Sequence, residues 1–314
     1  MKRRVFTKFL PIASTLVGVL LFASPANAFA QVAQDTARGG PSLAEIGARL
    51  ANPLGGIWSI FTQNDLFFSN GNINTGGELA GVRVVFEPIL PIPLYGRGEK
   101  QWMFITRPKI PLLISQPVPL GFDRFTHVGG LSNTQLPLVV KPPLGRFQFA
   151  LGPTFRLPTA TRHEFGLHQW GVGPAVVLGY FTVPLSFGIF PSYHWGFTGR
   201  KDQTEPRESL GEMLYWFNYN LPDDWTIGSG RTINYDHNVA RRNRWNAPLG
   251  PQVGKTTKLG KMKINFRLGA YYSVAREDEF GQRWLITLNV IPVIPSLVTR
   301  PLLGGDSVPP SRLR

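Results

Sequence analysis

From residue 57 onward the chain repeats segments of about ten residues in which apolar and polar side chains alternate. Alternation with a period of two predicts β-strands that have one apolar and one polar face. Twelve such segments can be placed, at 57–68, 78–90, 100–113, 130–140, 146–157, 169–180, 185–197, 211–221, 225–237, 245–254, 262–275 and 283–294. The pattern predicts an all-β fold, a transmembrane antiparallel β-barrel over residues 57–296.

The connections between these segments are alternately short and long. Tight turns are predicted at 142–145, 182–184 and 222–224, and longer polar loops at 114–129, 158–168 and 198–210. Short turns at one rim and long loops at the other are typical of outer-membrane barrels, whose long loops face outward. The 91–99 connection is long for a periplasmic turn, and 238–244 is short for an external loop.

Charged side chains fall on one face of the predicted strands. A charge that faces lipid at mid-depth costs about 2–4 kcal/mol, so the charged face is expected to line the lumen. The lumen and selectivity candidates are Arg83, Glu87, Arg107, Lys109, Arg146, Arg156, Glu212, Asp236, Lys263, Arg267 and Arg283. Arg231 is an exception, because strict alternation places it beside Ile227 and Ile233 on the lipid face, where either a bulge or a position near the membrane interface would accommodate it.

Aromatic residues gather at the ends of the predicted strands, which suits the two girdles that flank the apolar band of a barrel. A soluble β-sandwich with one wet face does not explain this placement. The residues concerned are Trp58, Phe67, Phe68, Trp102, Trp170, Tyr180, Trp195, Trp225, Trp245 and Trp284.

The uncharged stretch from Gly171 to Pro191 is long enough for a transmembrane helix. Its glycines and prolines are poor helix formers, so we interpret it as two strands joined near Thr182. Small residues lie on the inner face of the first of these strands. They leave space for a solute or for an N-terminal plug, or they allow the strand to curve sharply in the barrel wall. They are Gly171, Gly173, Ala175 and Gly179.

The N-terminus has the features of an export signal. Four basic residues at 2–8 precede the apolar stretch 9–23, and small residues at 26–28 fit a peptidase site. We predict a signal peptide over 1–28, with an alternative cleavage after residue 30. The stretch is short for a membrane anchor, which needs about 20 residues.

Residues 29–56 are predicted to form a periplasmic lead-in or a plug segment. Ser42 and Glu45 fit a capping box for a short helix that ends near Leu50. Whether this helix rests at the rim or enters the lumen is open at this point. Residues 297–314 form a Pro-rich C-terminal tail.

Composition narrows the class of protein further. The formal net charge is +14, but the 33 Lys and Arg residues are scattered along the chain, so nucleic acid is not an expected partner. The chain has no cysteine, which suits an exported protein stabilised by a closed sheet. A mean hydropathy of −0.05 is compatible with a barrel, because half of its strand residues face water.

Several short segments, in a consistent order, resemble the bacterial outer-membrane family of MetA-pathway phenol-degradation proteins, which is transporter-like. They are Leu50-Ala51-Asn52-Pro53, Gln63-Asn64, Leu151-Gly152-Pro153, the run 157–161, Gln169-Trp170-Gly171-Val172-Gly173-Pro174, His194-Trp195 and the run 268–272. The resemblance implies a barrel that passes small, aromatic or apolar compounds, and it implies no catalytic residues. The chain departs from outer-membrane barrels at its end, because the last strand is followed by the Pro-rich tail instead of closing on an aromatic residue.

The excess of basic residues on the predicted inner face leaves two interpretations open. Basic residues in a pore favour anions, but the same side chains can form a lattice of ion pairs that fills the barrel. The first interpretation predicts an outer-membrane channel for passive passage of small solutes, aromatic or anionic. The second predicts a structural barrel without transport. The expected partners are outer-membrane lipid, lipopolysaccharide, the barrel-insertion machinery and a small solute.

An enzyme is a further alternative. Ser192 and His194 share one face of a predicted strand, and a hydroxyl with a nearby base is the basis of nucleophilic catalysis in a lipid hydrolase. The pair is expected in the lumen, away from lipid, so we predict no enzymatic activity. His163, Glu164 and His168 lie in a predicted solvated loop without helical register, so no metal and no cofactor is expected.

Overall fold

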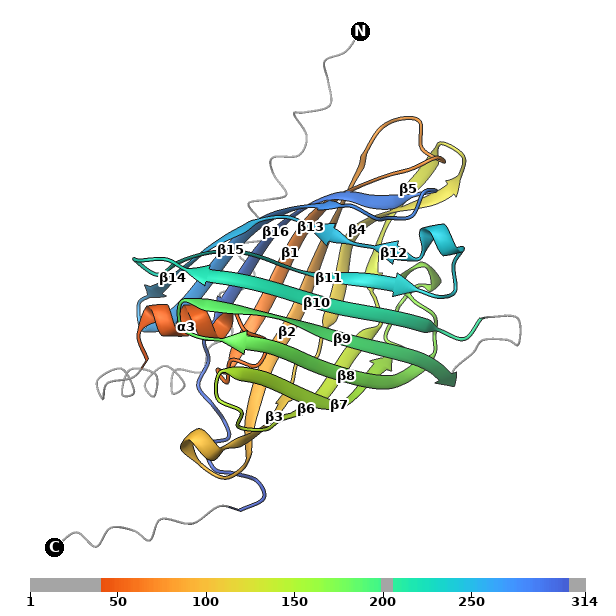
Figure 1. The fold of residues 1–314 in the computed structure, drawn as a ribbon. Helices are drawn as coiled ribbons and strands as arrows, with labels where there is room; N and C mark the ends of the chain where they lie inside the picture. Colours follow the sequence, from red (N-terminus) through yellow and green to blue (C-terminus); the bar gives the residue numbers. More distant parts are fainter. Residues whose placement is uncertain (1–40, 199–205, 305–314) are drawn as a thin grey trace, which may run out of the picture. The chain divides into compact units, whose positions relative to one another are not determined.

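The computed structural model describes residues 41–198 and 206–304, which form a closed antiparallel β-barrel (Figure 1). The predicted signal peptide lies outside the described residues. The strands are β1 (Ser59–Asn70), β2 (Leu79–Tyr95), β3 (Trp102–Thr106), β4 (Ile110–Gly121), β5 (Arg124–Leu131), β6 (Thr134–Lys141), β7 (Phe147–Leu157), β8 (Trp170–Phe181), β9 (Leu185–Thr198), β10 (Ser209–Asn220), β11 (Trp225–Asp236), β12 (Trp245–Asn246), β13 (Pro248–Leu249), β14 (Gln252–Leu259), β15 (Met262–Ser273) and β16 (Gly281–Pro292).

The barrel closes because β1 pairs with both β2 and β16. Three strands of the barrel are interrupted, and the pieces of each count as one strand. These are β3 with β4, β5 with β6, and β12 and β13 with β14. The described residues therefore form the 12-stranded antiparallel barrel that the alternation predicted. No described helix is long and apolar enough to cross a membrane.

The connections differ from the prediction at two places. The expected loop 114–129 is wrong, because β4 and β5 continue as a hairpin to a turn at Phe122 and Asp123, where Asp123 has a φ of 53°. At the opposite rim β2 runs to Tyr95, which shortens the expected 91–99 connection to 96–101 with the 3₁₀ helix η2 (Gly98–Lys100). Alternation identifies strands but not where a hairpin ends, since an exposed hairpin can continue beyond the membrane.

The outer wall is apolar, as a surface that faces lipid requires. Exposed side chains on it include Leu112, Leu151, Leu178, Phe217, Ile227, Leu268, Ile286 and Leu288. Six tryptophans at strand ends are also 40% or more exposed, namely Trp102, Trp170, Trp195, Trp225, Trp245 and Trp284. Trp58 and Phe67 depart from the predicted girdles, because both side chains are buried.

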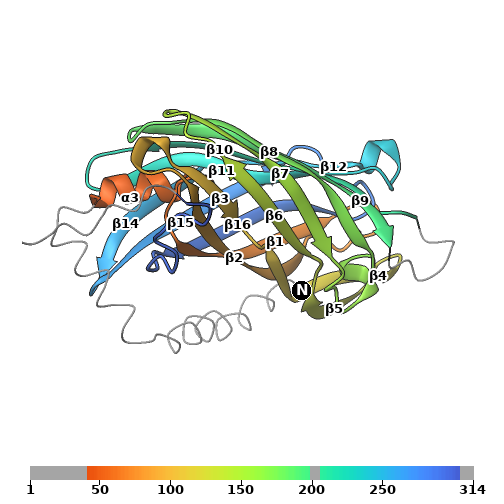
Figure 2. The same cartoon turned by 90° about the horizontal axis from the view of Figure 1, so that it is seen from below.

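The segment before β1 lies inside the barrel. It begins with helix α3 (Leu43–Leu50), whose N-cap Ser42 Oγ accepts a hydrogen bond from the Glu45 amide at 3.1 Å. Figures 1 and 2 show α3 at the barrel end near β14, and the helix contacts β14, β10 and β15. Beyond the helix, Leu54 is 1% exposed and packs in an apolar cluster with side chains of the inner wall: Ile105, Val139, Ala150, Ala175, Val177, Phe190 and Trp216.

Hydrogen bonds fix this segment to the wall. The Nδ2 of Asn218 donates to the carbonyl of Ala51 at 3.2 Å, and the Nζ of Lys141 donates to the carbonyl of Leu54 at 3.1 Å. The sequence could not place the segment, because an amphipathic helix of eight residues suits a rim or a lumen equally. In the folded barrel, its apolar face covers apolar inner-wall positions.

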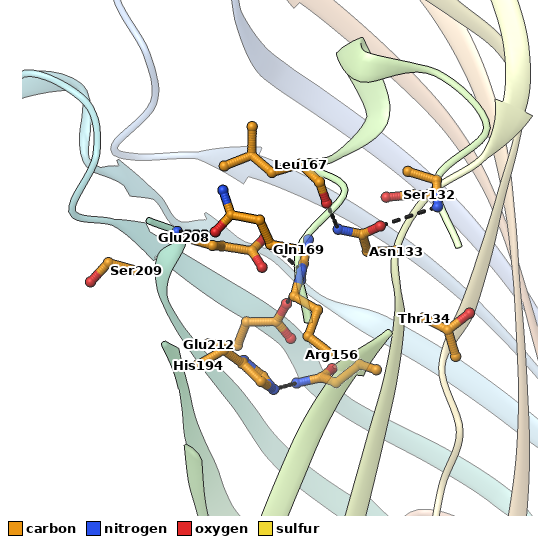
Figure 3. Close-up of polar contacts among 12 residues, drawn as sticks. Ser132, Asn133, Thr134, Arg156, Leu167, Gln169, His194, Glu208, Ser209 and Glu212 are labelled. Atoms are coloured by element: carbon orange, nitrogen blue, oxygen red, sulfur yellow. Dashed lines mark hydrogen bonds and ion pairs between the residues drawn. The ribbon is translucent and has the colours of Figure 1, made fainter. Parts of the chain in front are cut away.

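A loop between β7 and β8 narrows the other end of the lumen. It contains the 3₁₀ helix η3 (His163–Phe165), and the Phe165 side chain is 6% exposed against Leu113 and Ala160. The Asn133 side chain donates to the carbonyl of Leu167 at 2.8 Å (Figure 3). The predicted external loop 158–168 therefore folds onto the inner wall.

Candidate functional site

A cavity of about 420 Å³ lies in the lumen between these two constrictions. Leu50, Ala51 and Pro53 line it on the side of the N-terminal segment, and Phe165 lines it on the side of the loop. Among the described residues, five cationic side chains line it: Arg83, Arg107, Lys109, Arg231 and Arg267. A pocket of this volume lies within the range of small-molecule sites, about 300–1,000 Å³.

Asp65 on β1 joins two of these cations. Its Oδ2 atom accepts from Arg83 Nη2 at 2.7 Å and from Arg231 Nη2 at 2.5 Å. Asp65 is 1% exposed, so its charge is held almost out of water. Two guanidinium groups sharing one carboxylate leave this cluster with a net positive charge.

A second cluster lies near the loop constriction (Figure 3). Lys109 Nζ lies 3.4 Å from Glu212 Oε2, and Arg156 lies 2.7 Å from Glu208 Oε1 and 3.6 Å from Glu212 Oε1. Burial raises the pKa of Glu208, which precedes β10, above its usual range, while the charge of Arg156 opposes that shift. Here two cations face two carboxylates, so the cluster is balanced.

Arg107 and Arg267 are the remaining two cations that line the cavity. Arg107 Nη2 lies 2.8 Å from Glu87 Oε1. Arg267 Nε donates to Asn265 Oδ1 at 2.8 Å, and Arg267 Nη2 is buried without an acceptor among the described residues. The cations of the cavity therefore differ in how far the protein itself neutralises them.

The remaining predicted lumen residues lie away from the cavity. Arg146 departs from the expectation, because it is exposed in the turn before β7. Lys263 is buried and donates to the carbonyl of Pro41, which ties β15 to the N-terminal segment at 3.3 Å. Asp236 ends β11 at the opposite rim, and Arg283 pairs near that rim with Glu78 at 3.5 Å.

Arg231 lies inside the barrel, which corrects the lipid-facing position expected from alternation. The ladder from β11 to β14 stops at Gly228, and pairing resumes at Asn234 with β12. Between these positions the described residues 229–233 and 247–251 form no ladder with each other, although each segment pairs with its other neighbour, and Ser229 Oγ bridges the gap to the Gly250 carbonyl at 2.6 Å. Where the ladder is broken, alternation no longer fixes the face of a side chain.

Sequence reasoning did not select Asp65 and Glu208, although both bind predicted lumen cations. Asp65 shares the inward parity of Gln63, so alternation contained a signal for it. Glu208 precedes its strand, where alternation says nothing. Both acids become partners only when distant strands meet across the lumen.

The small residues of β8 are explained by packing. A side chain at Gly179 would overlap the indole of Trp216, whose Nε1 donates to Ser186 Oγ at 3.0 Å. Ala175 is buried in the cluster that holds Leu54. These positions therefore make room for a tryptophan and for the N-terminal segment.

The proposed nucleophile and base do not form a catalytic pair. Ser192 Oγ accepts from Gln135 Nε2 at 3.3 Å, and His194 Nε2 lies 3.0 Å from Thr154 Oγ1. His194 Nδ1 is buried without a partner among the described residues, so the third group that a catalytic triad places on this nitrogen is missing there. The described residues also contain no group of His, Asp or Glu side chains suited to a metal ion.

Solved structures with a similar fold include outer-membrane channels. The COG4313 outer membrane channel from Pseudomonas putida F1 has a TM-score of 0.52 and 11% identity, over 76% of this chain and 96% of that chain. The NanC porin has a TM-score of 0.45 and 11% identity, over 75% of this chain and 99% of that chain. The CymD monoaromatic hydrocarbon channel has a TM-score of 0.32 and 9% identity, over 84% of this chain and 97% of that chain. No curated protein matches the sequence.

The fold and the apolar outer wall place the protein in the outer membrane of a Gram-negative bacterium. Residues 113–282 match a family described as "Putative MetA-pathway of phenol degradation". This match covers more than half of the chain and confirms the family resemblance drawn from the short segments. The chain therefore belongs to the MetA-pathway phenol-degradation family of outer-membrane barrels.

Proposed function

We propose that this barrel passes small solutes passively across the outer membrane and favours anions. The observation that carries the proposal is the cavity of about 420 Å³ inside the lumen, lined by five described cations. The Asp65 cluster and Arg267 each leave positive charge without a matching carboxylate. Positive charge in a low-dielectric passage lowers the barrier for anions.

The lining also supports solutes with an apolar body. Phe61, Phe190 and Trp216 face the cavity beside the charged groups. This mixture of apolar wall and a few polar groups is typical of sites for small organic molecules. It agrees with the family description and with the monoaromatic hydrocarbon named for CymD.

The N-terminal segment is the constriction on this route. Its attachment through Leu54, Ala51 and Lys141 places it directly on one side of the cavity. We propose that passage requires this segment to shift within the lumen. A shift is compatible with a closed barrel, because the segment is not part of the ladder.

A structural barrel without transport is the second candidate. The contacts Asp65–Arg231 and Lys109–Glu212 cross the lumen between strands that are not neighbours, and such ties brace a filled barrel. The two candidates differ in one measurable property. A braced, filled barrel conducts no ions and takes up no solute.

Planar-bilayer recording and liposome uptake with the purified protein test the proposal. We expect conductance with a preference for chloride over potassium. The variant Arg107→Gln, Lys109→Gln, Arg267→Gln is expected to reduce that preference. A matched control, Arg97→Gln, Lys100→Gln, Arg146→Gln, removes three charges from exposed positions at one rim and is expected to change it much less.

Absence of conductance and of uptake in a correctly folded barrel would overturn transport and favour the structural candidate. Equal selectivity in the lumen variant and the unchanged protein would overturn the anion preference alone.

A further inference from the structure

Arg267 is a buried cation without a counter-charge. Its side chain is 6% exposed and lines the cavity, and no carboxylate of the described residues lies within ion-pair distance of it. Each of the other four cavity cations has a carboxylate within 4 Å. A guanidinium cannot lose its proton, and an uncompensated buried charge is costly. The described residues therefore supply no anion to this group.

Arg107 adds a second positive charge near Arg267. It lies close enough for its charge to act on Arg267, although Glu87 Oε1 at 2.8 Å neutralises it in part. Two guanidinium groups that face one space repel each other unless an anion lies between them. Guanidinium groups bind carboxylates through parallel N–H···O bonds, so a carboxylate matches this arrangement.

Phe61 lies on the wall between Glu87 and Asn265, the partners of these two cations. It faces Glu87 across the β1–β2 pair, and on its other side the register continues to Ile291, which pairs with Asn265. Glu87 binds Arg107, Asn265 orients Arg267, and Phe61 lines the same cavity as both cations. Leu50 of the N-terminal segment belongs to the apolar cluster against which Phe61 packs, and it also lines the cavity.

We infer that Arg267 binds the carboxylate of a small solute whose apolar body lies against Phe61 and Leu50. This inference rests on the proposed function, because it names the class of solute that the cavity accepts. The space suffices, since a dry protein cavity of about 150 Å³ already holds benzene, and the lumen cavity measures about 420 Å³. Acetate lacks the apolar body, and an amide of the same shape lacks the charge.

Equilibrium dialysis of the purified protein in detergent tests the site without requiring transport. The probes are 3-phenylpropionate, its neutral amide and acetate. We expect 3-phenylpropionate to bind at least about tenfold more tightly than either of the others, which corresponds to the loss of one charge-assisted contact or of the apolar contact. The Arg267→Gln variant is expected to lose about tenfold in affinity for the carboxylate and to keep its affinity for the amide.

Arg283→Gln is the matched control, because Arg283 is also an arginine of a barrel strand but lies outside the cavity lining, where it pairs with Glu78. It is expected to leave the affinity unchanged. Equal binding of acid and amide by the unchanged protein would overturn the inference, and this comparison needs no variant to fold. Equal affinity in Arg267→Gln, with circular dichroism showing intact β-structure, would overturn it as well.

Liposome uptake separates this inference from the proposed function. Binding that depends on Arg267, without uptake of any probe, would keep the carboxylate site and overturn the channel. Uptake that shows no preference for the acid and no dependence on Arg267 would keep the channel and overturn the site.

Discussion

Arg231 on β11 reaches Asp65 on β1 across the lumen, with 2.5 Å between Nη2 and Oδ2. Around the barrel β16, β15 and β14 separate these two strands, so the contact spans the interior and does not follow the wall. Arg83 binds the same Oδ2 atom from the neighbouring strand. One carboxylate thus joins two sides of the barrel.

Asp65→Asn is expected to destabilise the barrel, because it leaves two guanidinium groups without their shared anion. We expect a loss of about 2–4 kcal/mol in the free energy of unfolding, less than for a fully dry pair, since the Arg83 side chain is 27% exposed. Urea unfolding from lipid vesicles, followed by tryptophan fluorescence, measures it. Glu78→Gln, which breaks the more exposed pair with Arg283, is the control and should cost less than about 1 kcal/mol. Equal losses in both variants would contradict the prediction.

Leu54→Ala is expected to loosen the N-terminal segment. Removing a buried leucine side chain costs about 2–5 kcal/mol of packing, and here that packing holds the segment on the inner wall. Single-channel conductance should therefore rise in planar bilayers. Leu144→Ala, in an exposed turn, should leave conductance unchanged. If Leu54→Ala conducts like the unchanged protein, the segment is not the constriction.

Gly81→Ala is expected to destabilise the barrel by steric overlap. Gly81 faces Phe67 across the β1–β2 pair, and an added Cβ would overlap the phenyl ring. Forcing such an overlap costs about 1–3 kcal/mol. In a double-mutant cycle, Phe67→Ala combined with Gly81→Ala should cost less than the sum of the two changes. Gly76→Ala, where a Cβ would meet only a side-chain oxygen at 3.4 Å, is the control. Strict additivity would rule out the overlap.

Low pH is expected to release the β1–β2 loop from the β4–β5 turn. The Thr75 hydroxyl and amide both donate to the Asp123 carboxylate, and these hydrogen bonds lower the pKa of Asp123 below its usual 3.8. Because the folded pKa is the lower one, this contact stabilises the loop above pH 3.8 and is lost as the pH falls through the folded value. Hydrogen exchange of residues 72–77 at neutral and acidic pH, corrected for intrinsic rates, measures it.

Asp123→Asn should remove this pH dependence. The corrected hydrogen-exchange rate of the loop should then be the same at neutral and at acidic pH. The same pH dependence of loop protection in Asp123→Asn and in the unchanged protein would contradict the assignment to Asp123.

The alternation of apolar and polar residues determined the strands, their number and most of their faces. In β16, for example, Ile286 and Leu288 are exposed on the outer wall, while Thr287 and Asn289 are buried in the lumen. A period of two suffices for this, because each residue of an intact strand points opposite to its neighbour. The inward position of Arg83, Arg107 and Arg267 followed from the same rule.

Only the tertiary structure decided which of these charges are neutralised and where the N-terminal segment lies. Barrel closure brings β1 opposite β11 and β10 opposite the β3–β4 unit, so Asp65 meets Arg231 and Glu212 meets Lys109. These distances depend on strand tilt, register and the break in the β11 ladder, and local periodicity encodes none of them. For the same reason the chain alone shows that Arg267 faces inward, while only the closed barrel shows that it lacks a carboxylate partner among the described residues.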